Sequence, residues 1–422
     1  MDKLANIHCV GQHYVSTAAK WDHMLADVEL PDGADCAPGA DIRRCGRGFM
    51  RRTGAISEPT LSENGSAVPA APAGKNFRCP FNESNTSTAD FLAKLRDVAG
   101  SSKSLPDAEP CGRVVVIQKD GFVGECAGGR RIFEGLTAAG CECCLCSQSD
   151  ARWIDKINPS LAITMHHSVA VPQGVMSALV HTVPQNGTTG AKALKYDAVL
   201  YSTPDIDNLE SEVARSGNTL RAVQFFPSVK ATEFFDKPKE RLAYAGVNWD
   251  RRRRSSYAKL WNLLDGTGYF DVYGPQNAWK RCAPKSYRGF AKWDNGELLS
   301  KLQSAGIVLV LHADQHLSSG TPAWRVFEAA ASSAVMICDR NKFVVDNFGD
   351  SVLYVDHNVS PEEMFAQIDG HVRWLRENPE KAMAMARRSH AIFLEKFTLE
   401  KQIDSALKLL REIAAEKSAA AK

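Results

Sequence analysis

From residue 113 onward, short apolar runs alternate along the chain with longer stretches in which apolar residues recur every three or four positions. The first pattern is typical of buried strands and the second of amphipathic helices. Runs such as 113–118 (RVVVIQ) and 307–313 (IVLVLHA) are rich in β-branched residues, and helical stretches such as 128–140 and 296–306 end in glycine. Strands that alternate with helices predict an α/β fold built on parallel, doubly wound sheets.

The predicted strands fall into two series, separated by the stretch 226–240 (FPSVKATEFFDKPKE), which we interpret as an interdomain linker. The first series lies at 113–118, 141–147, 160–168, 196–203 and 220–228. The second series lies at 240–249, 269–275, 286–290, 307–313, 334–339 and 351–356. Among the helices, one opens on Ser360 with Glu363 three residues later, which is a capping-box pattern. The two series predict two Rossmann-like domains in tandem.

The chain divides accordingly into four parts. Residues 1–105 are a poorly readable N-terminal extension, 106–230 the first Rossmann-like domain, 240–395 the second, and 396–422 a C-terminal helix. Within the extension, 53–90 is rich in Ser, Gly, Pro, Ala and Asn. That composition indicates a linker or a long surface excursion.

Composition and charge narrow the class of protein. The 422 residues exceed what one hydrophobic core usually serves, which favours two domains. A net charge of +2 argues against a nucleic-acid partner. No apolar run approaches the roughly 18 residues of a membrane helix, and the N-terminus lacks the apolar core of a signal peptide. We therefore expect a cytoplasmic protein without a transmembrane segment, which leaves peripheral membrane contact open.

Four of the twelve cysteines crowd into the stretch 141–147 (CECCLCS). Two overlapping C-x-x-C pairs, Cys141 with Cys144 and Cys143 with Cys146, are one way to hold a metal ion. The alternative is a strand whose cysteines act as small buried apolar groups. We favour the strand, because no second cluster of His and Cys lies nearby in sequence to complete a metal site.

Polar and glycine residues gather at the predicted carboxyl ends of the second series of strands, where doubly wound folds bind ligands. A glycine there lets the backbone turn tightly, and the following helix start offers free N–H groups to an anion. Arginines 251–254 add charge-assisted bonds for a diphosphate, or else form a solvated basic face. The candidate ligand-binding residues at these ends are Gly246, Asn248, Arg251, Tyr273, Gly274, Tyr287, Trp293, Asp294, His316 and Ser319.

Arg325 and Glu328 lie in the opening turns of an otherwise apolar helix within 321–333 (TPAWRVFEAAASS). A buried charge needs a partner, since burying it alone costs several kcal/mol, on the order of 3–5 when a pair is broken. The two side chains lie three residues apart on one face and are able to pair with each other. Alternatively, they point into a cleft, where Glu328 accepts bonds from a sugar diol and Arg325 meets phosphate.

The stretch 325–340 (RVFEAAASSAVMICDR), followed by 348–356 (FGDSVLYVD) and 377–397, resembles the donor-binding half of GT-B glycosyltransferases. The likeness is closest to bacterial group 1 glycosyltransferases, including those that resemble the spore-maturation protein CgeB. It covers roughly 240–422 and implies two Rossmann-like domains with a cleft between them, with the C-terminal helix packing back. In the first half it extends to 128–140, which is similar to the Gly-loop helix of such enzymes and places Gly128 and Gly129 on the acceptor side.

Retaining members of this family carry a Glu–x7–Glu motif whose second Glu contacts the nucleotide ribose, and Glu328 matches that second Glu. Gly320 stands where the first would fall, so the stereochemical outcome of the reaction stays open. Ser332 and Ser333 stand where the family usually has Cys and Gly. An acceptor-side base in such folds often comes from a strand end of the first domain, and His167 is our candidate, with a buried core histidine as the alternative interpretation.

The resemblance implies a hexosyltransferase-like enzyme in bacterial polysaccharide biosynthesis, with catalytic residues His167, Arg325 and Glu328. It takes a UDP- or GDP-type sugar as donor and a glycan or glycoconjugate precursor as acceptor. We expect no cofactor and no metal, because arginines and helix dipoles can neutralise the diphosphate. The alternative is a non-catalytic nucleotide-sugar-binding or assembly protein on the same scaffold.

Overall fold

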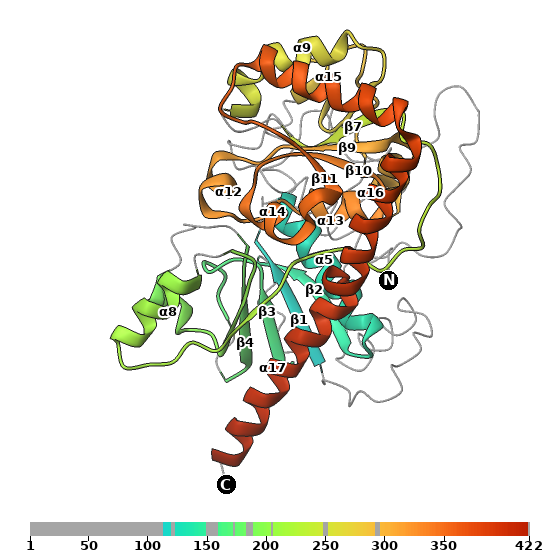
Figure 1. The fold of residues 1–422 in the computed structure, drawn as a ribbon. Helices are drawn as coiled ribbons and strands as arrows, with labels where there is room; N and C mark the ends of the chain where they lie inside the picture. The colour runs from blue at the N-terminus through green and yellow to red at the C-terminus, as the bar shows by residue number, and fades with distance from the viewer. Residues whose placement is uncertain are drawn as a thin grey trace, which may run out of the picture.

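The computed structural model describes residues 113–119, 123–148, 159–171, 174–182, 189–203, 206–247, 252–291 and 296–420. The predicted extension 1–105, with its linker 53–90, lies outside these residues. The described chain forms two parallel sheets, each flanked by helices, so the prediction of two Rossmann-like domains is confirmed (Figure 1).

Within the described residues, the first sheet has six strands and the second has five, and every strand pairs in parallel with its neighbours. In spatial order, the first sheet is β2 (Glu142–Ser147), β1 (Arg113–Gln118), β3 (Leu161–Thr164), β4 (Met176–His181), β5 (Ala198–Tyr201) and β6 (Ala222–Gln224). The second is β11 (Val352–Val355), β10 (Val335–Asp339), β9 (Gly306–Val310), β7 (Arg241–Ala245) and β8 (Phe270–Tyr273). Parallel strands covered on both faces are apolar throughout, as β9 (GIVLV) illustrates.

Helices connect the strands and cover the sheets. Among the described residues of the first domain they are α5 (Val123–Ala138), α7 (Gly190–Ala193) and α8 (Ile206–Arg215). In the second they are α9 (Ala258–Asp265), α10 (Gln276–Trp279), α11 (Glu297–Ala305), α12 (Asp314–Ser319), α13 (Arg325–Ala331), α14 (Lys342–Phe348), α15 (Pro361–Glu377) and α16 (Pro379–Ile392). The predicted capping box of α15 is confirmed, since Ser360 and Glu363 bond reciprocally. None of the described helices is long and apolar enough to cross a membrane.

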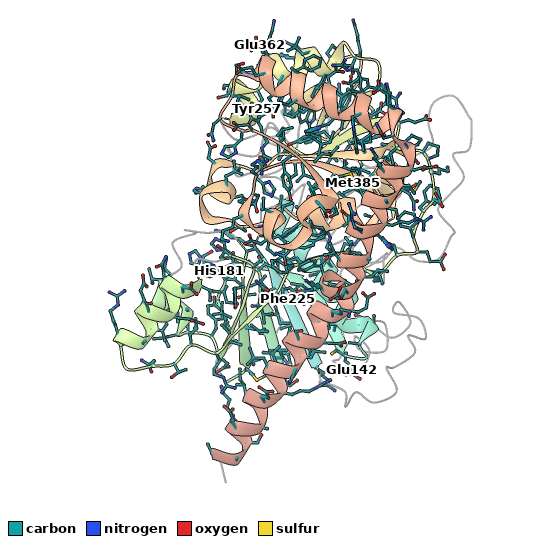
Figure 2. The ribbon with its side chains drawn as sticks, viewed as in Figure 1. Glu142, His181, Phe225, Tyr257, Glu362 and Met385 are labelled. Carbon is teal, nitrogen blue, oxygen red and sulfur yellow. The ribbon has the colours of Figure 1, made fainter. Side chains whose placement is uncertain are left out.

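The last helix, α17 (Leu399–Ala420), leaves the second domain and runs down along the first one to the C-terminus (Figure 1). Its apolar face completes the core of the first domain, where Leu399, Ile403 and Leu407 pack with residues of α5 and the first sheet. The expectation that the C-terminal helix packs back is therefore confirmed. In Figure 2, Phe225 marks this core, and Met385 marks the core of the second domain.

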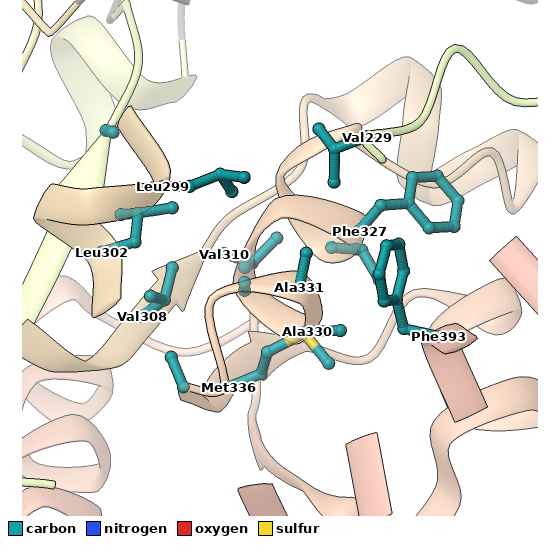
Figure 3. Packing of buried hydrophobic residues seen from close by; sticks show 14 of the residues in the cluster. Val229, Leu299, Leu302, Val308, Val310, Phe327, Ala330, Ala331, Met336 and Phe393 are labelled. Atoms are coloured by element: carbon teal, nitrogen blue, oxygen red, sulfur yellow. The ribbon is translucent and has the colours of Figure 1, made fainter. Parts of the chain in front are cut away.

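Small residues of α13 bring that helix close to the second sheet. Ala330 and Ala331 pack with Val310 and Met336 of the sheet, while Phe327 packs towards Phe393 (Figure 3). Every residue of α13 is buried, including Arg325 and Glu328. The buried position of these two charges makes α13 the element on which the site depends.

Several predicted elements differ from the structure. The strand β4 (MSALVH) was not predicted, because only three consecutive apolar residues lie between Ser177 and His181. The predicted strand 286–290 is reduced to a single bridge between Tyr287 and Val272. On β2, Cys143, Cys144 and Cys146 are buried, as the strand interpretation expects, and burial raises the pKa of Cys143. Cys141, just before the strand, is disulfide-bonded.

Candidate functional site

The strand order places a topological switch point in the second domain between β7 and β9, because the chain continues from β7 to β8 on one side and later to β9 on the other. Ligands of doubly wound sheets bind outside the carboxyl ends of the strands at such a point. Gly246 follows β7 and His312 follows β9 at this edge. The helix α13 lies beside it and contacts α5 of the first domain.

A buried charged triad joins the two domains at this place. Arg131 of α5 and Arg325 of α13 donate hydrogen bonds to different oxygens of the Glu328 carboxylate. The side chains of Arg131, Arg325 and Glu328 are only 3%, 9% and 2% exposed. Burial lowers the pKa of Arg325, the Glu328 charge opposes that shift, and the Arg131 charge adds to it. The pairing of Arg325 with Glu328 that the sequence allowed is present, but an arginine from the other domain shares the carboxylate.

Two glycines allow α5 to approach its neighbours closely. A Cβ on Gly128 would lie 2.6 Å from Cη2 of Trp324, the residue before α13. A Cβ on Gly129 would lie 2.7 Å from Nε2 of Gln118 on β1. The predicted helix began at Gly128, which is wrong, because α5 begins at Val123 and contains both glycines in its interior. Gly128 therefore allows close packing at the domain junction, and Gly129 allows close packing of α5 on β1 within the first domain.

A second buried pair lies at the carboxyl ends of β9 and β10. Asp339 accepts the backbone N–H of His312 at 2.8 Å, and its other oxygen lies 2.6 Å from His312 Nδ1. Both side chains are fully buried. Burial raises the pKa of Asp339, but the charge and hydrogen bonds of His312 outweigh burial and hold that pKa below its usual value. Nε2 of His312 has no hydrogen-bond partner within the described part of the chain.

His312, Cys338 and Asp339 place three potential metal-ligand atoms within 4.8 Å of one another. Nitrogen, sulfur and oxygen together would suit zinc. However, both Asp339 oxygens already accept bonds from His312, and burial raises the pKa of Cys338 well above its usual value, which disfavours the thiolate that binds metal. These residues fit a hydrogen-bonded cluster better than a metal site, and metal independence stays a prediction.

The predicted residues after β7 and β8 form one tight turn cluster. A Cβ on Gly274 would lie 2.2 Å from the Gly246 carbonyl oxygen, so only glycine fits there. That oxygen accepts a hydrogen bond from Trp279 Nε1 at 2.7 Å, and Tyr287 Oη donates to the Gly274 carbonyl at 3.1 Å. The Tyr287 hydroxyl therefore supports the loop. Tyr273 ends β8 half-buried, and burial raises the pKa of its hydroxyl.

The structure places the candidate residues His316 and Ser319 in the short helix α12. Asn341 secures the segment by donating to the carbonyls of His316 and Thr321, both at 3.0 Å. Gly320 ends α12 in the left-handed conformation with φ 68°. A glutamate in its place would be strained. The absence of the first Glu of the family motif therefore fits the local backbone.

Ser333 follows α13 and has a φ angle of 55°. It stands at the position where the glycosyltransferase family that the sequence resembles has glycine. A left-handed serine costs on the order of 1 kcal/mol. The segment between the domains holds it, because Ser333 Oγ accepts the Phe235 N–H at 2.9 Å and its carbonyl accepts from Lys239 Nζ at 2.7 Å. This end of α13 is thus anchored to the linker.

His167 does not lie on a strand. The predicted strand 160–168 is too long, because β3 ends at Thr164, before His166 and His167. Both lie in the following turn, with ring centroids 4.2 Å apart. His166 is buried and accepts the Ser168 N–H at 3.1 Å, whereas His167 is partly exposed. Burial lowers the pKa of His167, and the charges of Lys192 and Lys119 lower it further, which favours a neutral ring.

Four predicted residues, Asn248, Arg251, Trp293 and Asp294, lie outside the described residues. The structure also brings in three residues that sequence patterns did not single out: Arg131, His312 and Asp339. A polar residue directly after an apolar run was a usable signal for His312 and Asp339. Arg131 gave no signal, because a basic residue on an amphipathic helix usually faces solvent.

Comparisons with known proteins bear on the fold and on the second domain. Residues 236–408 match the model of a family described as glycosyl transferase-like. The sucrose-phosphate synthase of Thermosynechococcus elongatus superposes with a TM-score of 0.51 at 11% identity, over 72% of this chain and 100% of that one. An α-glucosyltransferase solved with UDP and a 13-mer DNA containing an HMU base superposes with a TM-score of 0.51 at 10% identity, over 71% and 99%. The described chain therefore has the GT-B fold of these enzymes.

The pneumococcal O-GlcNAc transferase GtfA, solved with UDP and GlcNAc, is also similar, with a TM-score of 0.47 and 15% identity over 63% of this chain. This chain spans 60% of the length of GtfA and 55% of the length of TarM from S. aureus. No curated protein sequence matches the chain significantly.

Proposed function

We propose that this protein is a glycosyltransferase that moves a sugar from a nucleotide-diphosphate sugar to an acceptor. The observation that carries the proposal is the position of Glu328. It lies on α13, within the matched glycosyl transferase-like stretch, beside the switch point and at the junction of the two domains of a GT-B fold. A carboxylate in that place suits a ribose diol, because it accepts hydrogen bonds from both hydroxyls.

The other residues take roles that follow from their places. Arg325 meets the diphosphate, and the turn of Gly246 and Gly274 lets the donor approach the backbone closely. Fixed positive groups that neutralise the departing diphosphate supply much of the rate. His167, on the first domain with a neutral ring favoured, acts as the acceptor-side base. No step in this scheme needs a metal.

The finer assignments belong to the same proposal. The donor is of the UDP or GDP type, and UDP is the first to test, since one protein of the same fold was solved with it. The acceptor is a glycan or glycoconjugate precursor, the transferred group a hexose, and the setting the bacterial cytoplasm. We place the protein nearest to the group 1, CgeB-like glycosyltransferases.

A non-catalytic nucleotide-sugar-binding protein is the second candidate. Two observations favour it. Gly320 stands where the first Glu of the family motif would be, and both oxygens of Glu328 are already bonded to arginines. Turnover separates the candidates, since a binding protein stabilises its ligand complex without consuming the sugar donor.

The test is a thermal-shift screen over UDP, GDP, CMP and dTDP sugars, followed by a donor-hydrolysis and transfer assay. A ligand at 100 times its Kd stabilises by about 2.7 kcal/mol, which is readily seen. Donor cleavage supports the enzyme, and binding without cleavage across acceptors supports the second candidate. If none of these sugars binds, the proposal is wrong.

His167→Ala tests the assignment of the base within the same assay. The variant is expected to lose about 10²–10⁴-fold in turnover while its donor Kd is unchanged. The matched control is His166→Ala, in which the buried neighbour that bonds to Ser168 is removed, so the variant is expected to lose stability. If His167→Ala turns over like the wild type, the base lies elsewhere.

A further inference from the structure

Arg131 is a charged residue that the proposed function does not yet use. It lies on α5 in the first domain, 197 positions from Glu328 in the sequence, and is buried against it. Its guanidinium also lies 5.7 Å from the ring centroid of Trp324, at the start of α13. The first domain therefore places an arginine against Glu328, the residue to which the proposed function assigns the nucleotide.

The hydrogen bonds of Arg131 are incomplete. One terminal nitrogen donates to the Pro227 carbonyl at 3.0 Å, and the other donates to Glu328. Its Nε–H is buried and has no hydrogen-bond partner among the described residues. A buried donor without an acceptor lowers stability. A ligand oxygen that accepted a hydrogen bond from Arg131 Nε would therefore bind with a favourable free energy.

Glu328 cannot meet a ribose in the arrangement described. Both of its oxygens bond to guanidinium groups, and its side chain is only 2% exposed. Arg325 lies on the same helix three residues away and moves together with Glu328. Arg131 belongs to the other domain, so it is the partner that can leave when the domains separate.

We propose that Arg131 is a diphosphate-binding residue supplied by the first domain: it holds Glu328 while the site is empty and moves to the diphosphate of a nucleoside diphosphate ligand when one binds. The exchange frees one side of Glu328 for the ribose. The planar guanidinium fork matches phosphate oxygens as well as it matches a carboxylate. This inference rests on the proposed function, which assigns the nucleotide to Glu328.

The test compares Arg131→Gln with the control Arg130→Gln, the preceding arginine of α5, which pairs with Glu134 of the same helix at 3.0 Å. Calorimetric titrations use uridine, guanosine, UDP, GDP and inorganic pyrophosphate. Arg131→Gln is expected to lower the affinity for UDP or GDP and for pyrophosphate by about ten- to a hundredfold. Its affinity for nucleosides is expected to equal or exceed that of the wild type. Arg130→Gln is expected to bind all five like the wild type.

A structural role for Arg131 gives another pattern. If Arg131→Gln loses affinity equally for nucleosides and diphosphates, or loses no affinity for diphosphates, the inference is wrong and the proposed function still stands. If Arg131→Gln does not fold, Arg131→Lys carries the test, because it keeps the charge and loses the fork. Arg131→Lys is expected to lose less affinity than Arg131→Gln, and only for UDP or GDP and pyrophosphate.

The proposed function fails by a different result. If pyrophosphate binds through Arg131 but no nucleoside or nucleotide binds, the anion site stands and the nucleotide assignment is wrong. If wild-type protein binds none of the five probes, both proposals are wrong.

Discussion

At the scale of single residues, Glu328 is the side chain on which the two domains meet, because its carboxylate bonds to one arginine of each domain. A buried charge that loses its partner is far more costly than an exposed one. The consequences of neutralising Glu328 therefore extend beyond ligand binding to the stability of the domain junction.

Glu328→Gln is expected to lower the free energy of unfolding by about 3–5 kcal/mol, because two buried guanidinium groups lose their charged partner. Urea denaturation measures the change. The control is Glu416→Gln, whose carboxylate pairs with Arg221 at 2.5 Å and whose side chain is 60% exposed. Its expected loss is about 1 kcal/mol or less. Equal losses in the two variants would contradict the buried triad.

The lowered pKa of Asp339 predicts that the free energy of unfolding falls at acid pH. Its pKa lies below the usual value, so its contribution is fully present above the pKa of an unfolded aspartic acid, about 3.9, and is lost as pH falls through the lower folded value. Wild-type protein is therefore expected to lose more stability between pH 6 and pH 3 than Asp339→Asn does. Urea midpoints at the two pH values measure this, and parallel losses would show that the His312 pair does not hold the carboxylate ionised.

At the scale of elements, the packing of α5 against the start of α13 depends on the missing side chain of Gly128. Its Cβ would meet an aromatic ring carbon of Trp324 and Cε of Met165, at 2.6 and 3.0 Å. A ring held between two domains yields less readily than a flexible side chain.

Gly128→Ala is expected to destabilise the protein by about 1–3 kcal/mol despite the better helix propensity of alanine. Gly370→Ala is the matched control, because Gly370 is also inside a helix and its Cβ would meet nothing within 4 Å. That control is expected to gain up to about 1 kcal/mol. Thermal melts compare the two, and a stabilised Gly128→Ala would show that α5 and α13 pack less tightly than described.

The elements also show what a sequence can predict. Apolar runs such as 113–118 and 307–313 identified strands, because both faces of a parallel sheet are buried and the signal is continuous. The start of α5 was misplaced, because interior glycines that serve a tertiary contact look like a helix boundary. The meeting of Arg131 with Glu328 was out of reach, since it depends on how two separately folded sheets face each other.

At the scale of the whole molecule, the chain crosses between the domains twice, along 225–240 and again where α16 gives way to α17. The two crossings lie side by side. The Leu399 N–H donates to the Val229 carbonyl at 2.8 Å, and the Phe226 N–H donates to Gln402 Oε1 at 3.0 Å. Two adjacent crossings permit rotation of one domain against the other about that place, which is the motion that separates Arg131 from Glu328.

Deletion of residues 399–420 is expected to unfold the first domain, because α17 supplies buried side chains of its core. Hydrogen exchange read by mass spectrometry should show lost protection in β1 to β6 and retained protection in β7 to β11. Deletion of 415–420 alone is the control, since those residues are exposed, and it should leave exchange unchanged. Retained protection of β1 to β6 after the longer deletion would mean that α17 is dispensable for that core.

The packing of α17 against the first domain also determines the order in which the two domains can fold during translation. The second sheet and its covering helices have all of their residues by the end of α16 and the short turn that follows it. The first domain, although its strands are translated earlier, lacks Leu399 to Ile413 until those residues leave the ribosome. Its apolar surface stays open through most of synthesis, so a nascent chain stalled before residue 399 would carry a finished second domain and a first domain dependent on chaperones.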